Sequence, residues 1–200
     1  MKLRNIEDVN LYKNQQLSRN NGFIEHLNLS IIGRYIPYDK NAIIVDVGCR
    51  SGQTIQTLIR FGYRNAYGLD LGDTTWSGLS TDVKNNFIKC DIHDGIPLNE
   101  KIDFISCSHM FEHVYDPKKI LSIFKSKLKD NGVLYISVPL DYNYKGMKHD
   151  AHYTFFESQD DLKKFLEENG FVVIEIETNN TGPGGMPEVL SFSKIKSNNV

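Results

Sequence analysis

Short apolar runs alternate with helical patterns along most of the chain. β-Branched and apolar residues predict strands over residues 42–47, 66–71, 86–91, 102–107 and 133–138. Between them, residues 54–61 and 118–128 carry apolar side chains at helical spacing, and Gly132 is expected to stop the second helix. Strands that alternate with helices predict a parallel sheet with crossover connections. The nearly continuous apolar strands predict that both faces of this sheet are covered.

The C-terminal part has a different pattern. Residues 158–169 predict a last helix, which Gly170 closes. Residues 171–177 and 189–195 then predict two strands, and the segment NNTGPGGMP between them is rich in turn residues. We therefore expect an antiparallel pair of strands at one edge of the sheet.

The length and charge limit the class of protein. A chain of 200 residues suits a single domain, here an N-terminal helical segment (1–38) and an α/β core (40–195). A formal net charge of -2 gives no reason to expect a nucleic-acid partner. No apolar run approaches the ~20 residues that span a bilayer, so no membrane partner is expected.

Cysteine usage and the N-terminus indicate the compartment. The three cysteines, Cys49, Cys90 and Cys107, are isolated and form no CxxC pair. This pattern predicts neither a zinc site nor a disulfide framework. The stretch MKLRNIEDVN lacks the apolar region of a signal peptide. A cytoplasmic location is the expectation.

Acidic and small residues follow the predicted strands. In open α/β sheets, ligands bind outside the carboxyl ends of the strands, which here are residues 46–52, Asp70, Asp91 and residues 106–109. Phosphate sites are usually lined by glycines, lysines and helix N-termini. The acids at these positions instead suit a ligand whose hydroxyl and amine groups donate hydrogen bonds. Asp70 is placed to accept two hydroxyls of a ribose.

The motifs at these positions resemble those of class I S-adenosylmethionine-dependent methyltransferases. DVGCRSG (46–52) resembles the family's acid followed by GxGxG, GLDL (68–71) its ribose-binding acid, and KCDI (89–92) its adenine-binding acid. MFEHVYDP (110–117), LKDNGVLYISVP (128–139) and the stretch 152–171 follow in the family's order. The resemblance covers roughly residues 40–178 and extends to the O-methyltransferases of ubiquinone biosynthesis.

The resemblance implies a fold and a set of cofactor contacts. The fold would be Rossmann-like, with strand order 3-2-1-4-5-7-6, the last strand antiparallel and helices on both faces. The expected cofactor-binding residues are Asp46, Gly48, Cys49, Arg50 and Gly52 in the first motif, Asp70 and Leu71 at the ribose, Asp91 and Ile92 at the adenine, and Ser108 or His109 near the sulfonium.

Arg50 departs from the family pattern, because it replaces the middle glycine of the first motif. A positive φ would be unfavourable for arginine. We therefore expect either that Arg50 occupies an allowed region and points outward, or that it reaches an acidic group of the cofactor or substrate.

The stretch SHMFEHV supplies candidate catalytic residues. Transfer of a methyl group to a hydroxyl needs a base, or a metal that lowers the pKa of that hydroxyl. If this stretch is a helical turn, His109, Glu112 and His113 share one face. Some ubiquinone-biosynthesis O-methyltransferases place metal-binding acids and a histidine here, but His109 stands where an acid is expected. A structural role for Glu112 and His113, a general base and a metal site all stay open, with no metal favoured. His152 is either a packed histidine or a substrate contact.

Other functions fit the sequence less well. A nicotinamide-dependent oxidoreductase would carry G-x-G-x-x-G, whereas Gly48 and Gly52 have three residues between them. Enzymes that methylate amino groups of bases often end the fourth strand in Asn/Asp-Pro-Pro-Tyr, and here that stretch is SCSHMF. We expect S-adenosylmethionine-dependent methyl transfer to a small-molecule acceptor, an oxygen of a sugar or of a phenolic or carboxylate metabolite. A non-catalytic cofactor-binding or scaffold protein is the alternative, and a homodimer stays open.

Overall fold

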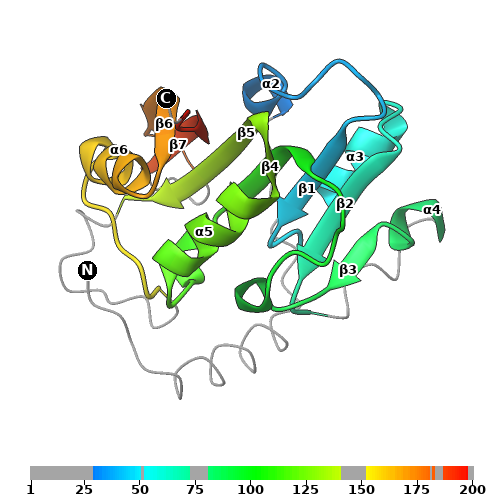
Figure 1. Cartoon of the computed structure of the whole chain (residues 1–200), viewed down its shortest axis with the longest axis horizontal. Coiled ribbons are helices and arrows are strands. Elements are labelled where there is room, and N and C mark those ends of the chain that lie inside the picture. The colour runs from blue at the N-terminus through cyan, green and yellow to red at the C-terminus, as the bar shows by residue number, and fades with distance from the viewer. Residues whose placement is uncertain are drawn as a thin grey trace.

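A seven-stranded sheet forms the centre of the protein (Figure 1). The computed structural model describes residues 29–50, 52–72, 81–140, 152–180, 182 and 187–197. The strands are β1 (Ile43–Val47), β2 (Asn65–Asp70), β3 (Phe87–Lys89), β4 (Ile102–Ser108), β5 (Leu128–Pro139), β6 (Phe171–Asn179) and β7 (Glu188–Ile195). Their order is β3-β2-β1-β4-β5-β7-β6. β1 to β5 pair in parallel, and β7 runs antiparallel to both β5 and β6. The predicted order and antiparallel strand are confirmed.

Side-chain caps mark the start of the two longest described helices, α5 (Pro117–Lys127) and α6 (Gln159–Glu168). The other described helices are α2 (Leu29–Ile32), α3 (Gln53–Arg60) and α4 (Thr81–Lys84), with 3-10 turns η2 (Ile92–Asp94) and η3 (Phe111–His113). The side chain of Asp116 accepts the Lys119 N–H before α5, and Ser158 does the same for Asp161 before α6. These bonds satisfy backbone donors that a helix start leaves open.

Helices cover both faces of the sheet, as predicted. Alternate strand residues belong to two separate hydrophobic clusters: Val45 packs in the cluster that contains Phe124 of α5 and Leu166 of α6, whereas Ile44 packs with Leu58 of α3. Neighbouring residues of a strand point to opposite faces, so the two clusters lie on opposite sides. The central strands β1, β4 and β5 are therefore buried on both faces, which explains why they are almost continuously apolar.

The end of α5 differs from the prediction. The helix ends at Lys127 and β5 begins at Leu128, so Gly132 lies within the strand and does not stop the helix. The pairing of β4 with β5 shifts register after Ile102. A Cβ on Gly132 would lie 2.9 Å from the carbonyl oxygen of Ile102. The glycine is thus needed for a close approach of two backbones rather than for a helix end.

The connections around β3 are short. The chain from β3 to β4 contains η2 and no α-helix within residues 92–101. Residues 73–80 of the preceding connection lie outside the described residues, and α4 follows them.

The predicted N-terminal helical segment lies outside the described residues up to residue 28. The turn after α2 packs against the outer strands: the Tyr35 ring stacks on Phe192 at 4.3 Å, and its hydroxyl donates to Glu175 over 2.6 Å. Arg34 pairs with Glu175 and Glu177 on β6.

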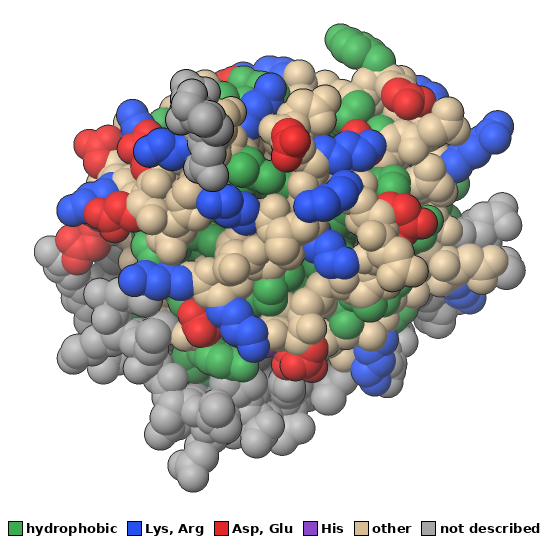
Figure 2. Space-filling model, in the orientation of Figure 1, with side chains coloured by type: hydrophobic (Ala, Val, Ile, Leu, Met, Phe, Trp, Pro, Cys, Tyr) green, Lys and Arg blue, Asp and Glu red, His purple; other side chains and the backbone are tan. Residues whose placement is uncertain are grey.

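Basic and acidic side chains are interspersed over the face of the molecule seen in Figure 2. Among the described residues, no helix has the length and apolar character needed to cross a membrane.

Candidate active site

The loop after β1 is built around two glycines. The N–H groups of Gly48 and Cys49 both donate to the carbonyl oxygen of Leu69, over 2.8 and 3.1 Å. Gly48 has φ 79°, and a Cβ on it would lie 2.6 Å from Cγ of Met110. Gly52 caps α3 in the left-handed conformation, with φ 70°. The loop conformation therefore requires glycine at position 48 and favours it at position 52.

Arg50 and Asp70 connect this loop to the end of β2. Arg50 has φ 42°, so this position does need the left-handed backbone that is unfavourable for arginine, and the residue is exposed. Its N–H donates to Oδ2 of Asp70 over 2.9 Å, and the N–H of Gly72 donates to Oδ1 over 2.9 Å. Each carboxylate oxygen can accept more than one hydrogen bond, so Asp70 keeps capacity for ligand hydroxyls. Leu71 follows it and is half-buried.

Asp91 closes the turn after β3. Its Oδ1 accepts the N–H of His93 over 3.0 Å and lies 2.9 Å from Nδ1 of the same residue. The His93 ring stacks on Tyr115 with 3.8 Å between centroids, and Ile92 is buried. Asp91 thus has a structural role at the position where the resemblance expects an adenine contact.

Asp46 and Ser108 lie on the central strands. Asp46 is 5% exposed and pairs in register with Gly68 on β2 and Ser106 on β4. Ser108 Oγ lies 2.9 Å from Ser137 Oγ on β5. Burial raises the pKa of the Cys49 thiol well above its usual value, and the charges of Asp46 and Asp70 raise it further. Cys49 therefore stays protonated and suits a packing role better than a nucleophilic one.

His109, Glu112 and His113 gather at the end of β4. They do not share a helical turn as expected, because η3 begins at Phe111 and His109 precedes it with φ 48°. The N–H of His109 donates to Ser137 O over 3.0 Å. Glu112 Oε1 lies 3.6 Å from His109 Nδ1 and 3.7 Å from His113 Nε2. The rings of His109 and His113 therefore both lie beside the Glu112 carboxylate.

The segment after residue 151 brings His152 to this group. The N–H groups of Tyr153 and Thr154 both donate to the carbonyl oxygen of Glu112, over 2.8 and 3.0 Å. The rings of His152 and His113 have centroids 4.9 Å apart and meet edge to face. His152 is buried. All four predicted catalytic residues thus lie together.

Glu188 completes the cluster and was not found by sequence analysis. It begins β7 and is only 6% exposed. Its Oε2 lies 2.6 Å from His109 Nε2, and its Oε1 accepts the side-chain N–H of Asn179 over 2.8 Å. The only signal in the sequence is an acid beside a turn-rich segment, which usually indicates a solvated strand end.

His109 and Glu112 stabilise each other's charged forms. Burial lowers the pKa of His109, but its hydrogen bonds and charge interactions with Glu112 and Glu188 outweigh burial and raise this pKa to about 10. Burial raises the pKa of Glu112, but the charges of His113 and His109 outweigh it and lower this pKa to about 2. At neutral pH, His109 is therefore an imidazolium and Glu112 a carboxylate.

Three residues of this cluster are spaced as metal ligands could be. One donor atom each from Glu112, His113 and His152 lie within 4.8 Å of one another, a spacing that three metal ligands can have. The imidazolium of His109 lies 3.6 Å from the same carboxylate and would repel a second cation. His109 therefore stands as a fixed cation beside Glu112, and we assign no metal.

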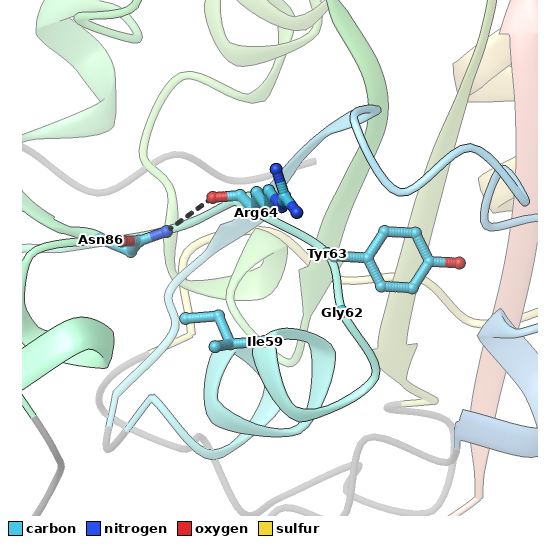
Figure 3. Close-up of a pocket in the computed structure, with 5 residues that line it drawn as sticks. All are labelled: Ile59, Gly62, Tyr63, Arg64 and Asn86. Carbon is cyan, nitrogen blue, oxygen red and sulfur yellow. Dashed lines mark hydrogen bonds between the residues drawn. The ribbon is translucent and has the colours of Figure 1, made fainter.

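A separate hollow lies at the other edge of the sheet (Figure 3). It has a volume of about 400 Å³ and is lined by Ile59, Gly62, Tyr63, Arg64 and Asn86. Asn86 precedes β3, and Arg64 precedes β2; the side-chain N–H of Asn86 donates to Arg64 O over 3.4 Å. The hollow faces the amino ends of these strands, away from the acids described above.

The strand order is that of the class I S-adenosylmethionine-dependent methyltransferase fold. A family model described as a methyltransferase domain matches residues 21–176, and the chain belongs to this family. Among solved structures, 1,6-didemethyltoxoflavin-N1-methyltransferase of Burkholderia thailandensis is similar, with a TM-score of 0.74 and 15% identity over 96% of this chain and 86% of that one. A likeness at this identity supports the fold.

Curated relatives share part of the sequence. Ubiquinone biosynthesis O-methyltransferase of Hydrogenovibrio crunogenus is 31% identical over 112 residues, which are 53% of this chain and 46% of that protein. Malonyl-[acyl-carrier protein] O-methyltransferase 2 of Coxiella burnetii is 27% identical over 136 residues, which are 66% and 54% of the two chains. The chain thus spans about half the length of these relatives.

Proposed function

We propose that this protein transfers a methyl group from S-adenosylmethionine to an oxygen of a small-molecule acceptor. The observation that carries this proposal is the family match over residues 21–176, together with a glycine loop that is hydrogen-bonded to Asp70 at the end of β2. The named curated relatives are O-methyltransferases, which supports oxygen as the acceptor atom.

The cofactor would lie across the carboxyl ends of β1 to β4. The proposed contacts are Gly48, Cys49, Arg50 and Gly52 along the methionine, Asp46 beneath that loop, Asp70 and Leu71 at the ribose, Asp91 and Ile92 at the adenine, and Ser108 near the sulfonium. The bonds from Arg50 and Gly72 to Asp70 support this placement, because they orient the carboxylate before any ligand arrives.

The transfer itself is an in-line displacement. The acceptor oxygen forms a bond to the methyl carbon as the carbon–sulfur bond breaks, and that electron pair stays on sulfur. The acceptor proton goes to a base, for which His113 and His152 are the candidates. Glu112 is a weak base because its pKa is low, but its carboxylate stabilises an imidazolium that forms beside it.

A sugar, a phenolic compound or a carboxylate metabolite is the proposed acceptor. A cytoplasmic location fits the three cysteines, which are all unpaired thiols. The alternative, a non-catalytic cofactor-binding or scaffold protein, would bind S-adenosylmethionine without turnover.

Methyl transfer can be tested with labelled S-adenosylmethionine and a panel of alcohols, phenols, sugars and carboxylates. We expect methylated product by mass spectrometry. In the His113→Ala variant, turnover should fall roughly 100-fold, the size of a general-base contribution, with unchanged affinity for S-adenosylhomocysteine. Cofactor binding without product from any acceptor class would favour the alternative. Full turnover in His113→Ala would remove His113 from the mechanism.

A further inference from the structure

The ring of His93 is buried directly beside Asp91, the acid that follows β3. Its Nδ1 lies 2.9 Å from Oδ1 of Asp91, and the backbone N–H of His93 donates to the same oxygen over 3.0 Å. An ionised carboxylate only accepts hydrogen bonds, so the hydrogen of the first contact lies on Nδ1. The terminal torsion of an aspartate is otherwise broad. Two donors from one residue therefore fix the orientation of this carboxylate.

The rest of the His93 ring packs against an aromatic partner. It stacks on Tyr115 with 3.8 Å between centroids and 9° between the ring planes. Nε2 of His93 is buried and has no hydrogen-bond partner among the described residues. Burial of such a polar atom is unfavourable, and a phenyl ring could keep the stack without it. What histidine adds at this position is therefore the Nδ1–H that binds Asp91.

The two side chains differ in what a ligand can reach. The Asp91 side chain is 18% exposed, whereas the Nε2 atom of His93 is closed off from solvent. A carboxylate accepts more hydrogen bonds than the two that His93 donates, so Asp91 keeps capacity for a donor on a ligand. Any effect of the His93 ring on a ligand therefore acts through Asp91.

We propose that His93 is a positioning residue for the cofactor, which holds the Asp91 carboxylate toward the 6-amino group of the adenine. This inference rests on the proposed cofactor site at the carboxyl ends of β1 to β4. It makes the site selective for adenosine over a 6-oxo purine nucleoside. The amino group of adenine donates hydrogen bonds, whereas an oxo group would turn a lone pair toward the carboxylate. A carboxylate that is held in place cannot turn away from that lone pair, so the mismatch lowers affinity.

Binding of S-adenosylhomocysteine and S-inosylhomocysteine compares the amino and oxo groups directly. Calorimetric titration gives both affinities without any acceptor or turnover. We expect the wild type to prefer the adenosine ligand roughly 100-fold, the effect of one hydrogen bond to a charged group. A general loosening of the site would lower both affinities alike. The ratio of the two affinities therefore reports on the carboxylate.

Two substitutions of His93 separate its hydrogen bond from its ring. His93→Phe keeps the stack on Tyr115 but removes the Nδ1–H, so the preference should fall about tenfold. The urea midpoint of this variant should be unchanged or higher, because the buried Nε2 is also removed. His93→Asn loses the stack, but its amide N–H can take the place of Nδ1–H. This variant should keep most of the preference, while its urea midpoint should fall.

Asp103→Asn is the matched control for Asp91→Asn. Asp103 is a half-buried acid that accepts a hydrogen bond from Lys129 near the start of β4, so its loss also removes a carboxylate with a structural contact. Asp91→Asn should lose most of the preference for the adenosine ligand, whereas Asp103→Asn should keep it.

The outcomes distinguish this inference from the proposed function. An unchanged preference in a folded His93→Phe protein, or a lost preference in His93→Asn, would overturn the inference and leave His93 a packing role. Equal affinities of the wild type for the two ligands would also overturn it, although the proposed function would stand. Binding of neither ligand would defeat the proposed function together with this inference.

Discussion

The backbone N–H of Arg50 donates to Oδ2 of Asp70 over 2.9 Å and thereby joins the glycine loop to the end of β2. The same carboxylate accepts the N–H of Gly72 through its other oxygen. Asp70 thus organises two backbone segments at the position where a ribose is expected to bind.

Replacement of Asp70 should therefore weaken cofactor binding. We expect Asp70→Ala to lower the affinity for S-adenosylmethionine about 100-fold, because hydrogen bonds to a charged acceptor contribute about 1.5 to 3 kcal/mol each. Asp70→Asn keeps one acceptor oxygen and should lose less. Calorimetric titration of both variants measures the effect, with Asp103→Ala as a control. Unchanged affinity in Asp70→Ala would show that the ribose assignment is wrong.

Gly48 should tolerate no side chain. A Cβ there would approach Met110 to 2.6 Å, and φ 79° is unfavourable for alanine. We expect Gly48→Ala to lower the free energy of unfolding by about 1 to 3 kcal/mol, measured in urea. The double variant Gly48→Ala/Met110→Gly removes both clashing atoms of Met110 and should recover only the part due to the clash. A fully stable Gly48→Ala protein would contradict this loop geometry.

At Arg50, which also has a positive φ, the test removes a side chain instead of adding one. Its φ of 42° lies in the left-handed region, where glycine carries no steric penalty. We expect Arg50→Gly to leave the free energy of unfolding unchanged or to raise it by up to about 1 kcal/mol. A drop in cofactor affinity in this stable variant would show that the arginine side chain contacts the ligand. A loss of more than 1 kcal/mol of stability would show that the side chain holds the loop.

The His109 cluster predicts how stability depends on pH. The pKa of His109 is raised from 6.5 to about 10 in the folded state, so its contribution is fully present below pH 6.5 and is lost as pH rises toward 10. The pKa of Glu112 is lowered from 4.5 to about 2, so its contribution is present above pH 4.5 and is lost as pH falls toward 2.

Urea unfolding at pH 6.5, 8 and 9.5 should therefore show a decline in the wild type that is smaller in His109→Gln. This substitution should also lower stability by roughly 3 to 5 kcal/mol, because it leaves two buried carboxylates without their cation. Parallel pH curves for the two proteins would contradict the assigned charge of His109.

The strand pattern of the sequence predicted most of the sheet. Continuous apolar runs indicate strands that are buried on both faces. The order of the strands in the sheet came from the family resemblance, because hydrophobic periodicity alone does not predict it. The end of α5 was predicted too late because Gly132 looked like a helix stop. Its actual role, a close approach to Ile102, depends on a partner strand that the sequence does not display.

The candidate site was only partly predictable. The strand-end acids could be identified because chain order places them at one edge of the sheet. The His109–Glu188 pair could not, because it joins residues 79 positions apart and Glu188 follows a stretch of sequence rich in turn residues. The backbone conformation of Arg50 could not be predicted either, because the loop imposes a positive φ there and Asp70 accepts its N–H.

Calorimetric titration of the purified wild-type protein with S-adenosylmethionine and S-adenosylhomocysteine, with and without a chelator, tests the central claim most directly. The account predicts one site that binds both ligands, with affinities that the chelator does not change. A chelator effect would return Glu112, His113 and His152 to consideration as metal ligands. Binding of neither ligand would contradict the assignment of residues 46–52 and Asp70 as a cofactor site.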